Sequence, residues 1–162
     1  MLDAPFDPNA VADWLADKTP DAGGIATFTG KVRAGGSDAH AVKALELSHY
    51  EPLTLPGMES LADEAIDRFR LMGLTIFHRV GMLYAGDPIV CVSAASRHRR
   101  DAILAVDFCM DHLKSAAWFW KRELRVSETG ERWHWIEPRD ADHADLARWQ
   151  TGPGLPATKP HR

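Results

Sequence analysis

Residues 96–123, with the sequence SRHRRDAILAVDFCMDHLKSAAWFWKRE, hold the pattern that decides how this chain folds. Apolar side chains recur at intervals of three and four through the middle of the stretch, at Ala102, Ile103, Val106, Cys109, Met110 and Leu113. This spacing is typical of an amphipathic helix. We therefore predict a helix over about residues 98–115 that packs one face against a sheet.

Basic residues stand at both ends of the predicted helix. Its first turn contains His98, Arg99 and Arg100, and a second group consists of Lys114, Lys121 and Arg122. Positive charge in a first turn opposes the helix dipole, so we interpret these cations as an anion-binding site at the helix N-terminus. The chain has a formal net charge of -4, so this basic patch is local. That balance disfavours general nucleic-acid binding and fits a pocket for one small anion.

Three aromatic residues, at positions 118–120, follow the predicted helix. They could line a flat heterocyclic ligand or belong to the core. Before the helix, residues 88–95 (PIVCVSAA) are almost all apolar, which predicts a central strand covered on both faces.

Two further helices and a hairpin are expected nearer the N-terminus. Asp7 and Pro8 are an N-cap and a first-turn proline for a helix over residues 8–18. Residues 57–72 have helical periodicity, after a connection marked by Pro52 and Pro56 and before Gly73, which we expect to end the helix.

The strands expected at residues 23–33 and 42–50 are predicted to pair as a hairpin. This pairing would place Lys31 and Arg33 beside a glycine-rich loop. Within the first strand, Phe28 is expected to face the core, and Gly30 indicates a bulge or a close approach of another backbone.

The remaining chain completes an α+β domain built on a largely antiparallel sheet. Residues 74–80 read as a strand, and His78 near its end is interpreted as structural. A turn at 127–130 precedes a strand with Trp133 and Trp135 on one face, and a short helix is expected over 141–149. We predict one domain over residues 1–150 and a disordered tail over 151–162.

The cysteines, Cys91 and Cys109, lie in apolar runs and are predicted to be buried and reduced. No secretory leader or membrane span is expected, so we predict a cytoplasmic protein. No motif for a metal or a cofactor is found, and neither thiol has the setting of a nucleophile. Lysine, arginine and histidine remain as the groups that could bind an anion, stabilise an oxyanion or act as a base or nucleophile.

Several short motifs together resemble one known family, the large catalytic subunit of molybdopterin synthase (the MoaE family). They are FTGKVR (28–33), HRVGMLYAGD (78–87), SRHRRDA (96–102), MDHLK (110–114), FWKRE (119–123), and ERW followed by IEPRD. They occur in the family's order over roughly residues 22–149. The family usually has proline before FWK, where this chain has Trp118.

The resemblance implies a hammerhead α/β fold and a sulfurtransferase without a cofactor. The implied reaction converts cyclic pyranopterin monophosphate (precursor Z) into molybdopterin by installing the dithiolene sulfurs. The sulfur would come from the C-terminal thiocarboxylate of a small ubiquitin-like subunit, which explains why no reactive cysteine is needed. The implied assembly is a homodimer of large subunits with one small subunit at each end, a heterotetramer.

The resemblance also implies residue roles. Lys114 and Lys121 are the expected catalytic residues. Lys114 would lie nearest the thiocarboxylate, as base, nucleophile or electrostatic clamp, and Lys121 would position substrate and transfer protons. The expected substrate-binding residues are Lys31, Val32, Arg33, His98, Arg99, Arg122, Glu123 and Arg139, with His98 and Arg99 on the phosphate. An alternative that the charge pattern leaves open is a non-catalytic phosphate- or nucleotide-binding module.

Overall fold

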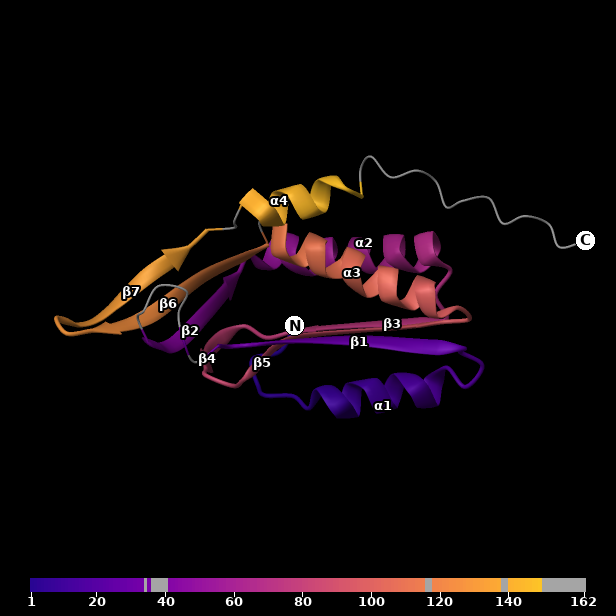
Figure 1. Cartoon of the computed structure of the whole chain (residues 1–162), viewed down its shortest axis with the longest axis horizontal. Coiled ribbons are helices and arrows are strands. Elements are labelled where there is room, and N and C mark those ends of the chain that lie inside the picture. The colour runs from indigo at the N-terminus through magenta and orange to yellow at the C-terminus, as the bar shows by residue number, and fades with distance from the viewer. Residues whose placement is uncertain (34, 36–40, 116–117, 138–139, 150–162) are drawn as a thin grey trace, which may run out of the picture.

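The structure of the chain, a computed structural model, describes residues 1–33, 35, 41–115, 118–137 and 140–149. The elements follow in the order α1 (Pro8–Lys18), β1 (Gly24–Lys31), β2 (Ala41–His49), α2 (Glu51–Phe69), β3 (Gly73–His78), β4 (Gly81–Tyr84), β5 (Pro88–Ser96), α3 (Arg99–Ser115), β6 (Phe119–Ser127), β7 (Gly130–Ile136) and α4 (Asp140–Ala147) (Figure 1). The helix predicted over residues 98–115 is confirmed as α3, and α1 matches its predicted bounds. The expected tail, 151–162, lies outside the described residues.

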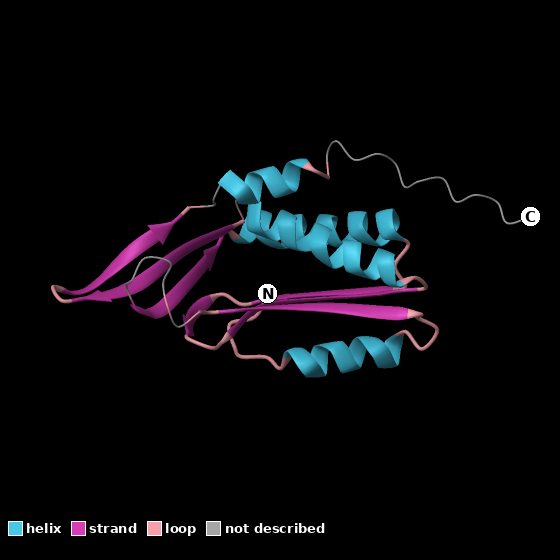
Figure 2. Ribbon diagram, viewed as in Figure 1, coloured by secondary structure: helices cyan, strands magenta, loops and turns pink. Residues whose placement is uncertain are grey.

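Two antiparallel sheets organise these elements. The first has the strand order β1-β5-β3, and the second has the order β4-β2-β6-β7. Helix α1 covers one face of the first sheet, whereas α2 and α3 cover the other (Figure 2). The second sheet extends away from this three-layer body, at the end where α3 finishes. The antiparallel α+β prediction is therefore confirmed.

The main core lies between the first sheet and helices α2 and α3. Its fully buried side chains include Phe108, Cys109 and Val92, each with 0% exposure. The central strand β5 is buried along most of its length, as its apolar run predicts. A smaller core joins the sheets and consists of Val32, Leu45, Leu47 and Leu83, with Ile89 packed against it.

The predicted hairpin between the first two strands is wrong. β1 pairs with β5, from Gly24 opposite Ser96 to Lys31 opposite Pro88, whereas β2 pairs with β4 and β6 in the other sheet. Alternation indicates that a segment is a strand but does not choose its partner. In the observed pairing, Leu45 and Leu47 are buried in the small core that joins the two sheets.

Phe28 lies on the core side of β1, as predicted, because it is opposite Val92 of the main core. It remains 40% exposed, since β1 is an edge strand of its sheet. The predicted irregularity at Gly30 is confirmed, since the register with β5 shifts between Gly30 and Lys31. A Cβ on Gly30 would lie 2.8 Å from Val90 Cγ1 and 3.4 Å from Phe28 Cε1. Glycine therefore lets the Phe28 ring and the Val90 side chain pack directly over the strand.

Helix α2 begins at Glu51, six residues before its predicted start. Pro52 occupies the first turn, where a missing N–H costs little. Pro56 lies inside the helix, so the prolines do not mark a connection. The helix is closed by Arg70 in the left-handed conformation (φ 51°), and Gly73 opens β3 instead of ending the helix.

Candidate active site

The two predicted catalytic lysines lie at the junction between helix α3 and strand β6. Lys114 is an exposed residue in the last turn of α3. Lys121 is half-buried, the third residue of β6, and pairs with Leu47 of β2 and Ile136 of β7. Only residues 116–118 separate the end of α3 from the start of β6, so the two lysines lie on either side of the junction where the second sheet leaves the three-layer body (Figure 1).

Lys121 lies on the same face of β6 as Phe119, because side chains two apart in a strand share a face. The Phe119 ring stacks on the imidazole of His78, with ring centroids 3.9 Å apart and planes 13° apart. His78 is 7% exposed, and its Nδ1 lies 2.9 Å from the backbone oxygen of Arg79. Burial is the main cause that lowers the pKa of His78 to about 4, and the Lys121 ammonium lowers it further. Lys121 therefore has an uncharged imidazole as a neighbour at neutral pH.

The lowered pKa of His78 predicts a loss of stability in acid. The unfolded chain takes up a proton near pH 6.5, whereas the folded chain does so only near pH 4. Stability is therefore complete above pH 6.5, and the free energy of unfolding should fall by up to about 3 kcal/mol as the pH drops towards 4. Urea titrations between pH 7.5 and 4 should show a smaller decrease in a His78→Leu variant than in the wild type. Parallel profiles for the two proteins would contradict this assignment.

Arg122 and Glu123 lie on opposite faces of the second sheet. Glu123 is on the Lys121 face and accepts a 3.3 Å hydrogen bond from Arg125 Nε. Arg122 is on the outer face, where it is ion-paired with Glu46 across the strands. Its guanidinium also lies 4.5 Å from the ring centroid of Trp133 and 5.6 Å from that of Trp135. The structure therefore does not bring Arg122 together with Lys121.

His98 and Arg99 are exposed at the opposite end of α3 from Lys114. A rise of 1.5 Å per residue places the backbones of Arg99 and Lys114 about 22 Å apart. All helical side chains lean towards the N-terminus, so this lean moves the Arg99 and Lys114 side chains in the same direction and leaves their separation along the helix unchanged. Within one chain, the predicted phosphate site and the predicted catalytic lysines are therefore separate.

The residues predicted from the FTGKVR motif have different surroundings. Lys31 is exposed and lines a cavity of about 510 Å³ with residues around the start of α1, including Asp7 and Asn9. Val32 is 6% exposed and belongs to the small core; its N–H bonds to Asp87 and its carbonyl accepts from Gly86. Both backbone groups of Val32 are thus used within the protein.

Two other residues complete the predicted set. Arg33 is exposed at the start of the loop after β1. Arg139 lies outside the described residues.

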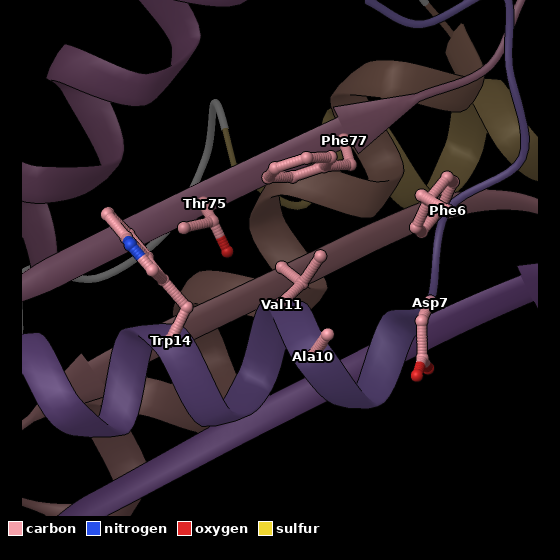
Figure 3. Close-up of a pocket in the computed structure, with 7 residues that line it drawn as sticks. All are labelled: Phe6, Asp7, Ala10, Val11, Trp14, Thr75 and Phe77. Atoms are coloured by element: carbon pink, nitrogen blue, oxygen red, sulfur yellow. The ribbon is translucent and has the colours of Figure 1, made fainter.

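A second cavity is apolar and lies apart from the basic residues. It has a volume of about 470 Å³ and lies between α1 and β3, on the face of the first sheet away from α2 and α3 (Figure 3). Its lining is mostly apolar, with Trp14, Val11, Phe6 and Phe77 around it and no cation among the residues that form it. This cavity does not fit an anionic ligand.

Neither cysteine offers a nucleophile. Both are buried and free, and burial, reinforced by Glu64, raises the pKa of the Cys109 thiol to about 12. Over the described ranges, no three histidine, cysteine, aspartate or glutamate side chains gather in a way that could hold a metal. None of the helices in this same part of the chain is long and apolar enough to span a membrane.

The sequence prediction missed the residues that support the junction. Thr54 is fully buried, and its hydroxyl donates a 2.8 Å hydrogen bond to the Trp118 carbonyl. Gly57 lies directly under the Trp118 indole. Residue Gly57 was predicted only as a helix start, and nothing local in the sequence connects it with an aromatic ring 61 positions later.

Comparison with known proteins matches this architecture to one family. The family model described as MoaE protein matches residues 1–116. The molybdopterin synthase catalytic subunit of Haemophilus ducreyi is 41% identical over 148 residues, which cover 91% of this chain and 93% of the relative.

Solved structures agree with this match. The molybdopterin biosynthesis MoaE protein of Burkholderia ambifaria is 40% identical, with a TM-score of 0.73 and coverage of 92% of this chain and 95% of that one. Molybdopterin synthase from Staphylococcus aureus is 25% identical, with a TM-score of 0.69 and coverage of 80% and 91%. The family-model match over most of the chain and these similar relatives and structures show that the chain belongs to the MoaE family of molybdopterin synthase catalytic subunits.

Proposed function

We propose that this chain transfers sulfur from the C-terminal thiocarboxylate of a small ubiquitin-like subunit to precursor Z, forming the dithiolene of molybdopterin. The observation that carries the proposal is the placement of Lys114 and Lys121 at one junction, in a chain whose thiols are both buried. A sulfur transfer without an accessible thiol on this chain requires a partner that brings the sulfur. Named relatives that are catalytic subunits support such an assembly.

Lys114 is assigned the position nearest the thiocarboxylate. It is exposed in the last turn of α3, where an extended tail from another protein can reach it. Once the thiocarboxylate sulfur has bonded to the pterin, water would add to the acyl carbon, and the Lys114 ammonium would stabilise the negative charge on the acyl oxygen of the resulting tetrahedral intermediate. Collapse of this intermediate breaks the carbon–sulfur bond, which leaves the sulfur on the pterin and the partner's tail as a carboxylate. An uncharged Lys114 amine could instead attack the acyl carbon, so that sulfur leaves to the pterin and water later releases the partner's tail as a carboxylate.

Lys121 is assigned to holding the pterin and moving protons. It lies on the inner face of β6 with Glu123, beside the neutral His78. A neutral neighbour avoids adding a second positive charge near Lys121, so the lysine can exchange a proton without competition from an imidazolium.

The separation along α3 leads us to propose that a complete site needs two copies of the chain. One precursor Z molecule is shorter than the distance of about 22 Å between the two ends of α3. In a homodimer with the two α3 helices antiparallel, Lys114 and Lys121 would face Arg99 of the partner subunit. His98 and Arg99 would then bind the phosphate from across the dimer.

An exposed aromatic surface supports the proposal that the chain works in an assembly. On the outer face of the second sheet, Tyr84, Trp120 and Trp135 are 56%, 49% and 65% exposed. Exposed apolar surfaces of this kind commonly mark contacts with other proteins. We propose a heterotetramer of two large and two small subunits, acting in the cytoplasm.

The experiment that tests this function is molybdopterin formation by the purified chain, a thiocarboxylated small subunit and precursor Z. Product is expected only when all three are present. Tight binding of precursor Z without product would favour a phosphate-binding module instead.

A further inference from the structure

We infer that Trp118 and Phe119 form a joint between the two halves of the fold, and that this joint positions Lys121 relative to Lys114. The joint consists of Thr54, Gly57, His78, Trp118 and Phe119. The inference rests on the proposed function only where it concerns the rate of the reaction. Its geometric part concerns the Lys121 amine and can be measured separately.

Helix α2 holds the Trp118 side of the joint. A Cβ built on Gly57 would lie 2.5, 2.7 and 2.7 Å from Cε2, Cζ2 and Nε1 of the Trp118 indole. These distances are too short for any side chain, so the indole is seated directly on the helix backbone. Thr54, one turn earlier, bonds to the Trp118 carbonyl at 2.8 Å and accepts a bond from the N–H of Tyr50 at 3.1 Å. Both the ring and the backbone of Trp118 are therefore fixed to α2.

Strand β3 of the first sheet holds the Phe119 side. The flat stack of Phe119 on His78, 3.9 Å between centroids, joins the last residue of β3 to the first residue of β6. The His78 imidazole is itself fixed by its bond to the Arg79 backbone. Trp118 is thus held by α2 and Phe119 by β3, which are two different elements of the three-layer body.

The joint lies between the two lysines in the chain, so it can set their relative position. Lys114 belongs to α3, which packs along α2, whereas Lys121 belongs to a strand of the second sheet. Lys121 follows Phe119 by two residues on the same face. The relative position of the two amines therefore depends on how β6 is attached to α2 and β3.

A purely structural role makes a different prediction. Lys121 is paired on both sides, with β2 and β7, and the small core around Val32 provides a second connection between the sheets. A variant that weakens the joint should therefore leave the second sheet folded and change its position relative to the three-layer body. If the joint only stabilised the fold, its variants would lose stability and leave Lys121 unchanged in the folded protein.

The test is a Gly57→Ala variant, in which the new methyl group displaces the Trp118 ring. A displacement of about 1 Å at reacting groups can cost about 100-fold in rate, so we expect kcat for molybdopterin formation to fall at least about tenfold, with a smaller change in KM. Adding Trp118→Phe to Gly57→Ala makes room for the methyl group and should recover most of the loss. Glu59→Ala, on an exposed position of the same helix, is the matched control and should leave kcat unchanged.

A second readout needs no turnover. The acetylation rate of Lys121 by a water-soluble acetylating reagent can be followed by peptide mapping, with exposed Lys18 on α1 as the internal reference. Gly57→Ala should change the Lys121 rate at least about threefold, the double variant should restore it, and Lys18 should not respond; such a change is the size expected from a small shift in environment. If Gly57→Ala does not fold, Trp118→Phe alone is expected to alter the Lys121 rate in the same assay.

The two readouts separate the two claims. A wild-type chain that makes no molybdopterin would remove the proposed function, while the Lys121 acetylation rate would still decide the positioning role. The inferred positioning role would be overturned if the wild type is active and both the Gly57→Ala and Trp118→Phe variants keep its kcat and its rate of Lys121 acetylation.

Discussion

Replacing Lys114 with alanine is expected to abolish detectable molybdopterin formation, a loss in kcat of at least about 10²- to 10³-fold. The reason is that Lys114 offers an exposed charge at the end of α3, where we propose that the partner's thiocarboxylate binds. Loss of one preorganised charge from a developing oxyanion has this magnitude, and loss of a nucleophile would cost more. Single-turnover assays with saturating small subunit measure the effect on chemistry alone.

The fold and the assembly should survive this change. Lys114 is exposed, so truncating it leaves no buried cavity, and the thermal midpoint and the mass of the complex should match the wild type. Lys18→Ala is the matched control, an exposed lysine in the last turn of another helix, and it should keep full activity. Near-normal turnover by Lys114→Ala would show that the lysine assignment is wrong.

Two inactive variants are expected to restore activity when they form mixed dimers. The first variant is Lys114→Ala, and the second is His98→Ala combined with Arg99→Ala. If each site takes its phosphate-binding end from one copy and its lysines from the other, a mixed dimer contains one site with every substitution and one site with none. Purified mixed dimers should then have about half of the wild-type activity, because a two-fold dimer has two equivalent sites.

Co-expression of the two variants with different affinity tags, followed by two successive affinity steps, isolates the mixed dimers. The parents, purified in the same way, are the controls and should be inactive. Sites built within single chains give the opposite result, since neither chain of a mixed dimer would then be intact. Mixed dimers as inactive as their parents would refute the shared site.

The local pattern of the sequence was sufficient to predict α1, α3 and the buried strand β5. In each case the signal lies within the element, as apolar spacing for α3 and as a continuous apolar run for β5. The irregularity at Gly30 was predicted for the same reason. The pairing of the strands was not predicted, because β1 lies against β5, whose paired residues are 57 to 72 positions away, and nothing in either strand specifies the other.

The candidate site was predicted in its residue types but not in its geometry. Reading residues 119–123 as a strand would have placed Lys121 and Arg122 on opposite faces, and Arg122 is indeed occupied by Glu46 and two tryptophans. The helix between the basic groups was predicted correctly, and its length keeps His98 and Arg99 away from Lys114 of the same chain. The contact between Gly57 and Trp118 depends on tertiary packing alone.

The central claim is that this chain completes a sulfur transfer for which another protein supplies the sulfur. The most direct measurement is the yield of molybdopterin from precursor Z, with the small subunit in its thiocarboxylate form or in its ordinary carboxylate form. The account predicts product with the thiocarboxylate alone, and two thiocarboxylates consumed for each molybdopterin, because the dithiolene contains two sulfurs. No product with a small subunit that is active alongside another large subunit, or equal product with the carboxylate form, would contradict it.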